Sequence, residues 1–108
     1  MQRILSIIAG TLLLAGNSGD ATAADAAKAE ALAKQYNCLQ CHSADKKLIG
    51  PSYKEVATRY KGKPDASAVL AKSIKGGVKG TWGPIPMPAN DKVPDGDIKI
   101  LVNWILSM

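Results

Sequence analysis

The chain has 108 residues and a formal net charge of +5, from 14 Lys and Arg against nine Asp and Glu; it has two Cys, one His and no Phe. This length allows one small domain with a modest core, and two cysteines with one histidine cannot complete a four-ligand structural zinc site. The basic residues are scattered and do not interleave with aromatic side chains, so we expect no nucleic-acid partner, but a solvated face that steers acidic proteins.

The first residues have the pattern of a secretory signal peptide. Arg3 precedes an apolar run from Ile4 to Ala15, and Ala21-Thr22-Ala23 fits the small-residue cleavage pattern. A retained membrane anchor is the alternative, but the run is well short of the roughly 20 apolar residues that a spanning helix needs. We therefore expect residues 1–24 to be removed by cleavage after Ala23 or Ala24, and residues 25–108 to form one domain.

A helix is expected directly after the leader. The segment from Asp25 to Asn37 contains Ala, Lys, Glu, Leu and Gln but no Gly or Pro, which favours a helix, and Asp25 can cap its start. Leu32 and Tyr36 stand four residues apart and so lie on one apolar face. This helix would deliver Cys38 at its end.

The next five residues hold all the thiol and imidazole groups of the chain. Cys38-Leu39-Gln40-Cys41-His42 has the CxxCH spacing with which two thiols attach a haem c and the next residue offers its imidazole to the iron. A thioredoxin-like dithiol would need an alternating strand and helix pattern, which is not visible here. A plain disulfide gives no reason for a histidine to follow directly. The motif therefore predicts one covalent haem, bound through Cys38 and Cys41.

Two short helices are expected in the middle of the chain. After an irregular segment, Ser52 and Glu55 form a capping box that predicts a helix from Tyr53 to about Tyr60. Asp65 can cap a second helix that continues through Lys75. The second helix would bury residues spaced four apart, namely Ala66, Leu70 and Ile74.

The remaining chain is expected to form a stiff loop and a last helix. Six Gly and Pro residues between Gly80 and Pro94 rule out regular structure there, and a loop of this length in a small domain is usually functional or disordered. The segment from Asp95 to Met108 is expected to be helical, capped by Asp95 or Asp97. Its buried stripe would contain Ile98, Leu101, Val102 and Ile105, with Trp104 at the flank.

The second axial position of the iron is approached by elimination. His42 is the only imidazole and both thiols are used for attachment, so methionine, lysine, tyrosine or an open site remain. Met87 lies between prolines in the stiff loop, which favours it as a ligand held at a fixed distance. A lysine ligand and an open sixth position stay as alternatives; an open site would indicate a gas sensor or a peroxidase-like protein.

The order of these motifs resembles the small bacterial class I cytochromes of the cytochrome c-551 type. The resemblance is carried by the haem motif, by Gly50-Pro51, by Trp82-Gly83-Pro84-Ile85-Pro86-Met87-Pro88 and by Trp104 in the last helix. It implies that His42 and Met87 are the axial ligands of the iron. It also implies that the Pro51 carbonyl accepts the Nδ1 proton of His42, that Trp82 donates to a haem propionate, and that Asn90 lies near the sulphur of Met87.

The sequence departs from this family pattern in two places. Ser73 stands where family members often carry an arginine near a propionate. The segment from Asp91 to Asp97 is a residue longer than usual, which leaves the start of the last helix open.

We therefore expect an all-α class I cytochrome c fold, with about four helices packed around one covalent haem. The resemblance implies a monomeric periplasmic carrier of single electrons, not an enzyme, with no stable membrane insertion. Its partners would be a quinol-oxidising complex or other donor and a terminal reductase or oxidase as acceptor. A subunit of a larger redox complex is a further alternative.

Overall fold

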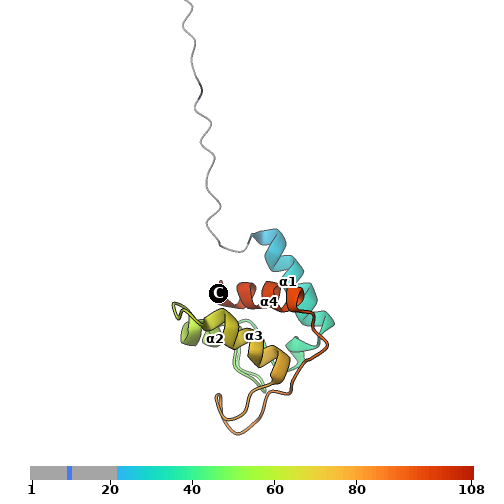
Figure 1. Ribbon diagram of the computed structural model, residues 1–108, viewed down its shortest axis with the longest axis vertical. Coiled ribbons are helices and arrows are strands. Elements are labelled where there is room, and N and C mark those ends of the chain that lie inside the picture. The colour runs from blue at the N-terminus through green and yellow to red at the C-terminus, as the bar shows by residue number, and fades with distance from the viewer. Residues whose placement is uncertain (1–9, 11–21) are drawn as a thin grey trace, which may run out of the picture.

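The computed structural model describes Gly10 and residues 22–108, so nearly all of the expected leader lies outside the described residues. The described part contains four α-helices and one 3-10 turn (Figure 1). They are α1 (Ala23–Gln35), η1 (Cys38–Gln40), α2 (Tyr53–Tyr60), α3 (Ala66–Gly76) and α4 (Asp95–Leu106). The expected all-α architecture is confirmed.

The start of α1 differs from the expected one. Thr22 is the N-cap: its hydroxyl accepts from the Asp25 backbone N–H at 3.2 Å, while the Asp25 carboxylate accepts from the Thr22 backbone N–H at 3.3 Å. Asp25 is thus the third residue of the helix and not its cap. A reciprocal box satisfies two free backbone donors, whereas Asp25 as cap would satisfy one, so the helix begins two residues earlier.

Helix α4 is the centre of the packing, and α1, α2 and α3 all contact it. In Figure 1, α1 and α4 lie together on one side of the molecule, with α2 and α3 across from them. The expected stripe of α4 is buried, and so are the predicted residues of α3. The core also includes residues from the other segments, among them Ala29, Leu32, Tyr53, Val56 and Val93.

The helix caps were predicted with mixed success. Ser52 caps α2 as expected, with its hydroxyl accepting from the Glu55 backbone N–H at 3.1 Å, but the Glu55 carboxylate makes no return bond, so only half of the expected capping box is formed. Asp65 occupies the N-cap position of α3 but makes no capping hydrogen bond. The expected cap of α4 was wrong: Pro94 is at the N-cap position, and Asp95 and Asp97 lie in the first turn. Carboxylates in a first turn still stabilise a helix through its dipole.

The segment between α3 and α4 is irregular apart from one backbone pairing. Val78 and Met87 form an isolated antiparallel bridge, with N–H to O distances of 3.0 and 2.9 Å in the two directions. Val93 then enters the core with no exposed surface. Of the helices in the described ranges, none has the length and apolar character needed to cross a membrane.

Candidate haem-attachment site

The two cysteines lie at either side of one tight turn. Asn37 adopts a left-handed conformation, with φ of 61°, that turns the chain from α1 into η1, and asparagine tolerates this region better than most residues. The Cys38 carbonyl then accepts from the backbone N–H of Cys41 at 3.2 Å and of His42 at 3.0 Å. Both cysteines are half-buried and free of a disulfide. A single turn, residues 38–42, therefore brings the two thiols and the imidazole close together.

The thiol of Cys38 does not have the properties of a redox-active dithiol. Burial raises the pKa of Cys38 above its ordinary value, with smaller opposing effects from hydrogen bonds. Catalytic dithiols work through a thiolate whose pKa is lowered. The environment of Cys38 therefore argues against the thioredoxin-like alternative.

The imidazole of His42 is held by the loop that follows it. Its Nδ1 lies 2.7 Å from the carbonyl oxygen of Pro51, the contact that the resemblance implied. The backbone of Gly50 passes so close that an added Cβ would lie 2.8 Å from Cε1 of His42. With Nδ1 donating to a carbonyl, Nε2 is the nitrogen that remains to bind a metal.

The backbone of Met87 is fixed from two sides. The bridge to Val78 uses both its N–H and its carbonyl. Gly77, with φ of +81°, packs against the same segment, and a Cβ there would come within 2.7 Å of the Met87 oxygen. A side chain would also be strained at this φ, so glycine permits the close approach. No motif in the sequence indicated this contact of Gly77.

Asn90 connects the Met87 segment to two helices. Its backbone N–H donates to the Ile74 carbonyl at 2.8 Å, and its side-chain amide donates to the Tyr36 carbonyl at 3.1 Å. The contacts join the loop to the ends of α3 and α1. The expected position of Asn90 near the sulphur of Met87 stays a prediction.

Trp82 is in contact with a cation that the sequence reading did not single out. The guanidinium carbon of Arg59 lies 4.5 Å above the centre of the Trp82 ring, and Nη1 of Arg59 donates to the Thr81 carbonyl at 2.9 Å. Arg59 therefore ties the loop to α2. Ser73 donates its hydroxyl to Val69 within α3. The propionate contact expected of Trp82 remains a prediction.

These residues fit a covalent haem. Cys38, Trp82 and Met87 are partly buried and pack against one and the same core, although Cys38 lies after α1 and the other two lie in the loop between α3 and α4. The donor set consists of two unpaired thiols, one imidazole with a free nitrogen and one thioether, which is the set that a His/Met haem c requires. The chain between residues 22 and 108 offers no cluster of three or more Cys, His, Asp or Glu as a competing metal site.

One groove of the described structure lies away from these residues. It has a volume of about 520 Å³ between α3 and α4 and is lined in part by Ala71, Lys75, Ile98 and Val102. A second hollow, of about 420 Å³, is lined by Ser52, Arg59 and Trp82 among others. Trp82 is the only candidate haem-site residue that borders either of them.

The fold and the attachment motif together define a c-type cytochrome, and comparison with known proteins agrees. Residues 26–108 match the cytochrome c family. The chain belongs to this family. Cytochrome c-551 of Pseudomonas aeruginosa is 45% identical over 105 residues, covering 96% of this chain and 93% of that protein. Cytochrome c-552 of Nitrosomonas europaea is 49% identical over 77 residues, covering 71% of this chain and 75% of that protein.

The solved structures agree with this assignment. The crystal structure of Nitrosomonas europaea cytochrome c552 matches with a TM-score of 0.69 at 49% identity, over 71% of this chain and 95% of that one. The class 1 cytochrome MtoD of Sideroxydans lithotrophicus ES-1 matches with a TM-score of 0.66 at 39% identity, over 77% of this chain and 95% of that one. The chain is thus a monohaem class I cytochrome of the c-551/c-552 type. It carries one covalent haem c and transfers electrons, and it is not an enzyme.

Proposed function

We propose that the chain is a periplasmic one-electron carrier whose haem is attached through Cys38 and Cys41 and ligated by His42 and Met87. The observation that carries the proposal is the double restraint on Met87, by the Val78 bridge and by the close approach of Gly77. A methionine in an ordinary loop needs neither. Of the other methionines, Met1 lies outside the described residues, and Met108 ends the chain, where its carbonyl oxygen accepts from Lys61.

In such a site the polypeptide has to restrain the two side chains that ligate the iron. Haem with a histidine and a methionine ligand exchanges single electrons and has no vacant position for oxygen or peroxide. Here the Pro51 carbonyl fixes the His42 ring through Nδ1, and the Val78 bridge fixes the backbone of Met87. Asn90 anchors the end of the Met87 segment to α3 and α1. Ligands fixed in this way need little rearrangement between the two oxidation states.

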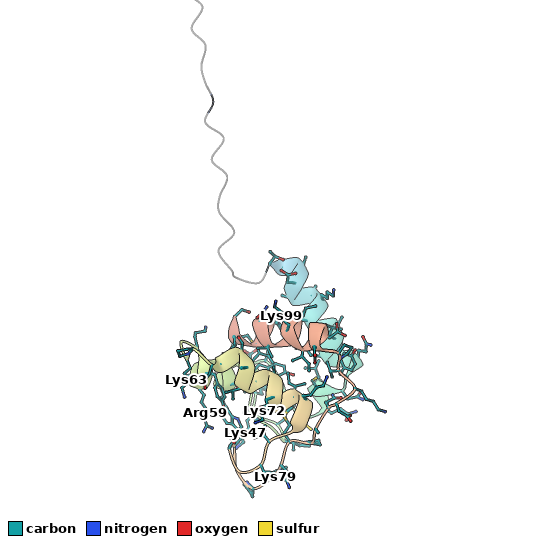
Figure 2. The ribbon with its side chains drawn as sticks, in the orientation of Figure 1. Lys47, Arg59, Lys63, Lys72, Lys79 and Lys99 are labelled. Atoms are coloured by element: carbon teal, nitrogen blue, oxygen red, sulfur yellow. The ribbon has the colours of Figure 1, made fainter. Side chains whose placement is uncertain are left out.

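The charge of the chain suits acidic redox partners. In the view of Figure 2, Lys47, Arg59, Lys63, Lys72 and Lys79 lie on the α2 and α3 side of the molecule, whereas Lys99 lies on α4. With a net charge of +5, such a surface speeds encounter with a negatively charged partner and makes the rate fall with rising salt. We propose a quinol-oxidising complex or other donor and a terminal reductase or oxidase as the partners. A stopped-flow rate of electron transfer to an acidic partner that does not depend on ionic strength would contradict this electrostatic attraction.

The proposed location follows from the leader. Residues 1–24 have the charge, the apolar run and the small-residue end of a signal peptide, with cleavage after Ala23 or Ala24. We propose that the protein is exported, that its haem is attached outside the cytoplasm, and that it is monomeric. Amino-terminal sequencing of the periplasmic protein tests the cleavage site, and its elution volume in gel filtration tests the monomeric state.

Optical spectra of the purified protein test the ligation. The oxidised protein should show the weak near-infrared band of methionine bound to ferric haem, and the pyridine haemochrome should show two thioether bonds. Met87→Ala should abolish the band and let the reduced protein bind carbon monoxide, while the control Met108→Leu should change neither. Rapid carbon monoxide binding by the unchanged protein would instead indicate the open-site alternative.

A further inference from the structure

The His42 imidazole is packed by an aromatic ring from α2 as well as held by its hydrogen bond. The ring of Tyr53 lies on it with the two centroids 5.1 Å apart and the two planes at 19°, which is a stacked pair. Pro51 and Gly50 contact the Nδ1 and Cε1 atoms of the same imidazole. His42 is therefore restrained by three residues of one short segment, Gly50, Pro51 and Tyr53.

Tyr53 is itself held in place. It is 4% exposed, and the ring of Trp104 from α4 meets it nearly edge-on, at 5.4 Å and 66°. The backbone N–H of Tyr53 donates to the Ser43 carbonyl at 2.9 Å, so the start of α2 is bonded to the residue that follows His42. The stack therefore joins the start of α2 to the segment of His42 and Ser43, and the backbone hydrogen bond fixes the position of one relative to the other.

A hydrogen bond to Nδ1 fixes where the imidazole points but leaves its plane free to turn about the line from Nδ1 to the Pro51 oxygen. A ring stacked on the imidazole removes that freedom, because aromatic pairs are favourable only over a narrow range of geometries. The orientation of the imidazole plane decides how its π orbital overlaps with the d orbitals of a bound metal. It therefore influences the magnetic properties of the oxidised site.

We infer that Tyr53 is a positioning residue that sets the orientation of the His42 imidazole plane through the stacking of its ring. This inference rests on the proposed ligation by His42. It assigns Tyr53 a role that neither the attachment motif nor the family comparisons specify. Trp104 does not contact the imidazole in this arrangement but packs edge-on against Tyr53 and so restrains the ring of Tyr53.

The test uses the oxidised holoprotein and two substitutions at one position. Tyr53→Phe keeps the ring, so the paramagnetic NMR shifts of the four haem methyl groups and the electron paramagnetic resonance g-values should stay close to those of the unchanged protein. Tyr53→Leu removes the ring, so the spread of the methyl shifts and the g-values should change while the low-spin optical spectrum remains. Tyr60→Leu on the same helix is the matched control and should leave both signals unchanged.

The outcomes separate this inference from the proposed function. Methyl shifts and g-values of Tyr53→Leu equal to those of the unchanged protein, in a low-spin His/Met spectrum, would overturn the role of Tyr53 and leave the ligation standing. If Tyr53→Leu does not fold, Tyr53→Met fills more of the same volume without a ring, and it carries the same expectation. An unchanged protein without a low-spin spectrum would overturn the ligation by His42, and this inference with it.

Discussion

Substitution of Gly77 by alanine tests whether the Met87 segment depends on the close approach of α3. Gly77 has φ of +81° and Gly62 has φ of +84°, and each follows the end of a helix. A positive φ costs a residue with a Cβ about 1–2 kcal/mol at Gly62. Gly77 has a ψ of 175° and so lies in a region almost restricted to glycine, where the cost is about 1–3 kcal/mol. The effect of the change from Gly to Ala on the flexibility of the unfolded chain is the same at both positions, so Gly62→Ala is the control for that effect and for a positive φ.

The two positions differ in what the new methyl group would meet. A Cβ at Gly62 has no heavy atom within 4 Å, whereas a Cβ at Gly77 lies 2.7 Å from the Met87 oxygen and 2.9 Å from the Ala89 nitrogen. Ordinary contact begins near 3.4 Å, so the Met87 oxygen must move by about 0.7 Å. Its 3.0 Å hydrogen bond from Val78 would then be stretched beyond a useful length.

The expected cost of Gly77→Ala is the sum of the backbone strain and the lost hydrogen bond. Loss of one backbone hydrogen bond adds about 1 kcal/mol, so Gly77→Ala should lower the free energy of unfolding by about 2–4 kcal/mol. Gly62→Ala should lower it by about 1–2 kcal/mol. Denaturant unfolding of the holoprotein measures both values. Only Gly77→Ala should also weaken the methionine-to-iron band; equal stability losses with an intact band in both variants would refute the reasoning.

Three further substitutions test the packing and the long-range contacts. Ser52→Ala removes the cap of α2 and should lower the free energy of unfolding by about 1 kcal/mol, measured by thermal or denaturant unfolding. Leu101→Ala at the buried centre of α4 should cost about 2–5 kcal/mol, whereas Leu48→Ala, at a half-exposed position, should cost little; similar losses would contradict the assigned core. The hydrogen bond to Asp97 raises the pKa of Tyr36, so its stabilisation is complete below the ordinary tyrosine pKa and is lost as the pH rises through the folded value. Tyr36→Phe should remove this alkaline loss from the pH profile of stability.

Local signals in the sequence were sufficient for most of the fold. Ser52 and Glu55 predicted α2 with its observed bounds, because a capping signal at the start of a helix is local. The buried stripe of α4 was also predicted, since its period matches the helix. The attachment motif needed only five adjacent residues. All of these features depend on neighbours in the sequence.

The features that the sequence did not reveal depend on contacts between distant segments. Tyr36 meets Asp97 across 61 positions, and Arg59 meets the Thr81 carbonyl across 22. The stack of Tyr53 on His42 is of the same kind, because it requires the loop between them to fold back. Hydrophobic periodicity and turn residues carry no information about such pairs.

The cap of α1 has a consequence for the exported protein. Cleavage after Ala23 or Ala24 would remove Thr22 and, with it, a hydroxyl worth about 1 kcal/mol to the helix. The new terminus would carry an ammonium group, which opposes the helix dipole but can pair with the carboxylate of Asp25. Such a pair weakens with salt, and it weakens again when the amine loses its proton at a pH of about 8. Processing would thus replace the hydroxyl cap of α1 by an ion pair whose strength depends on the pH and the salt concentration.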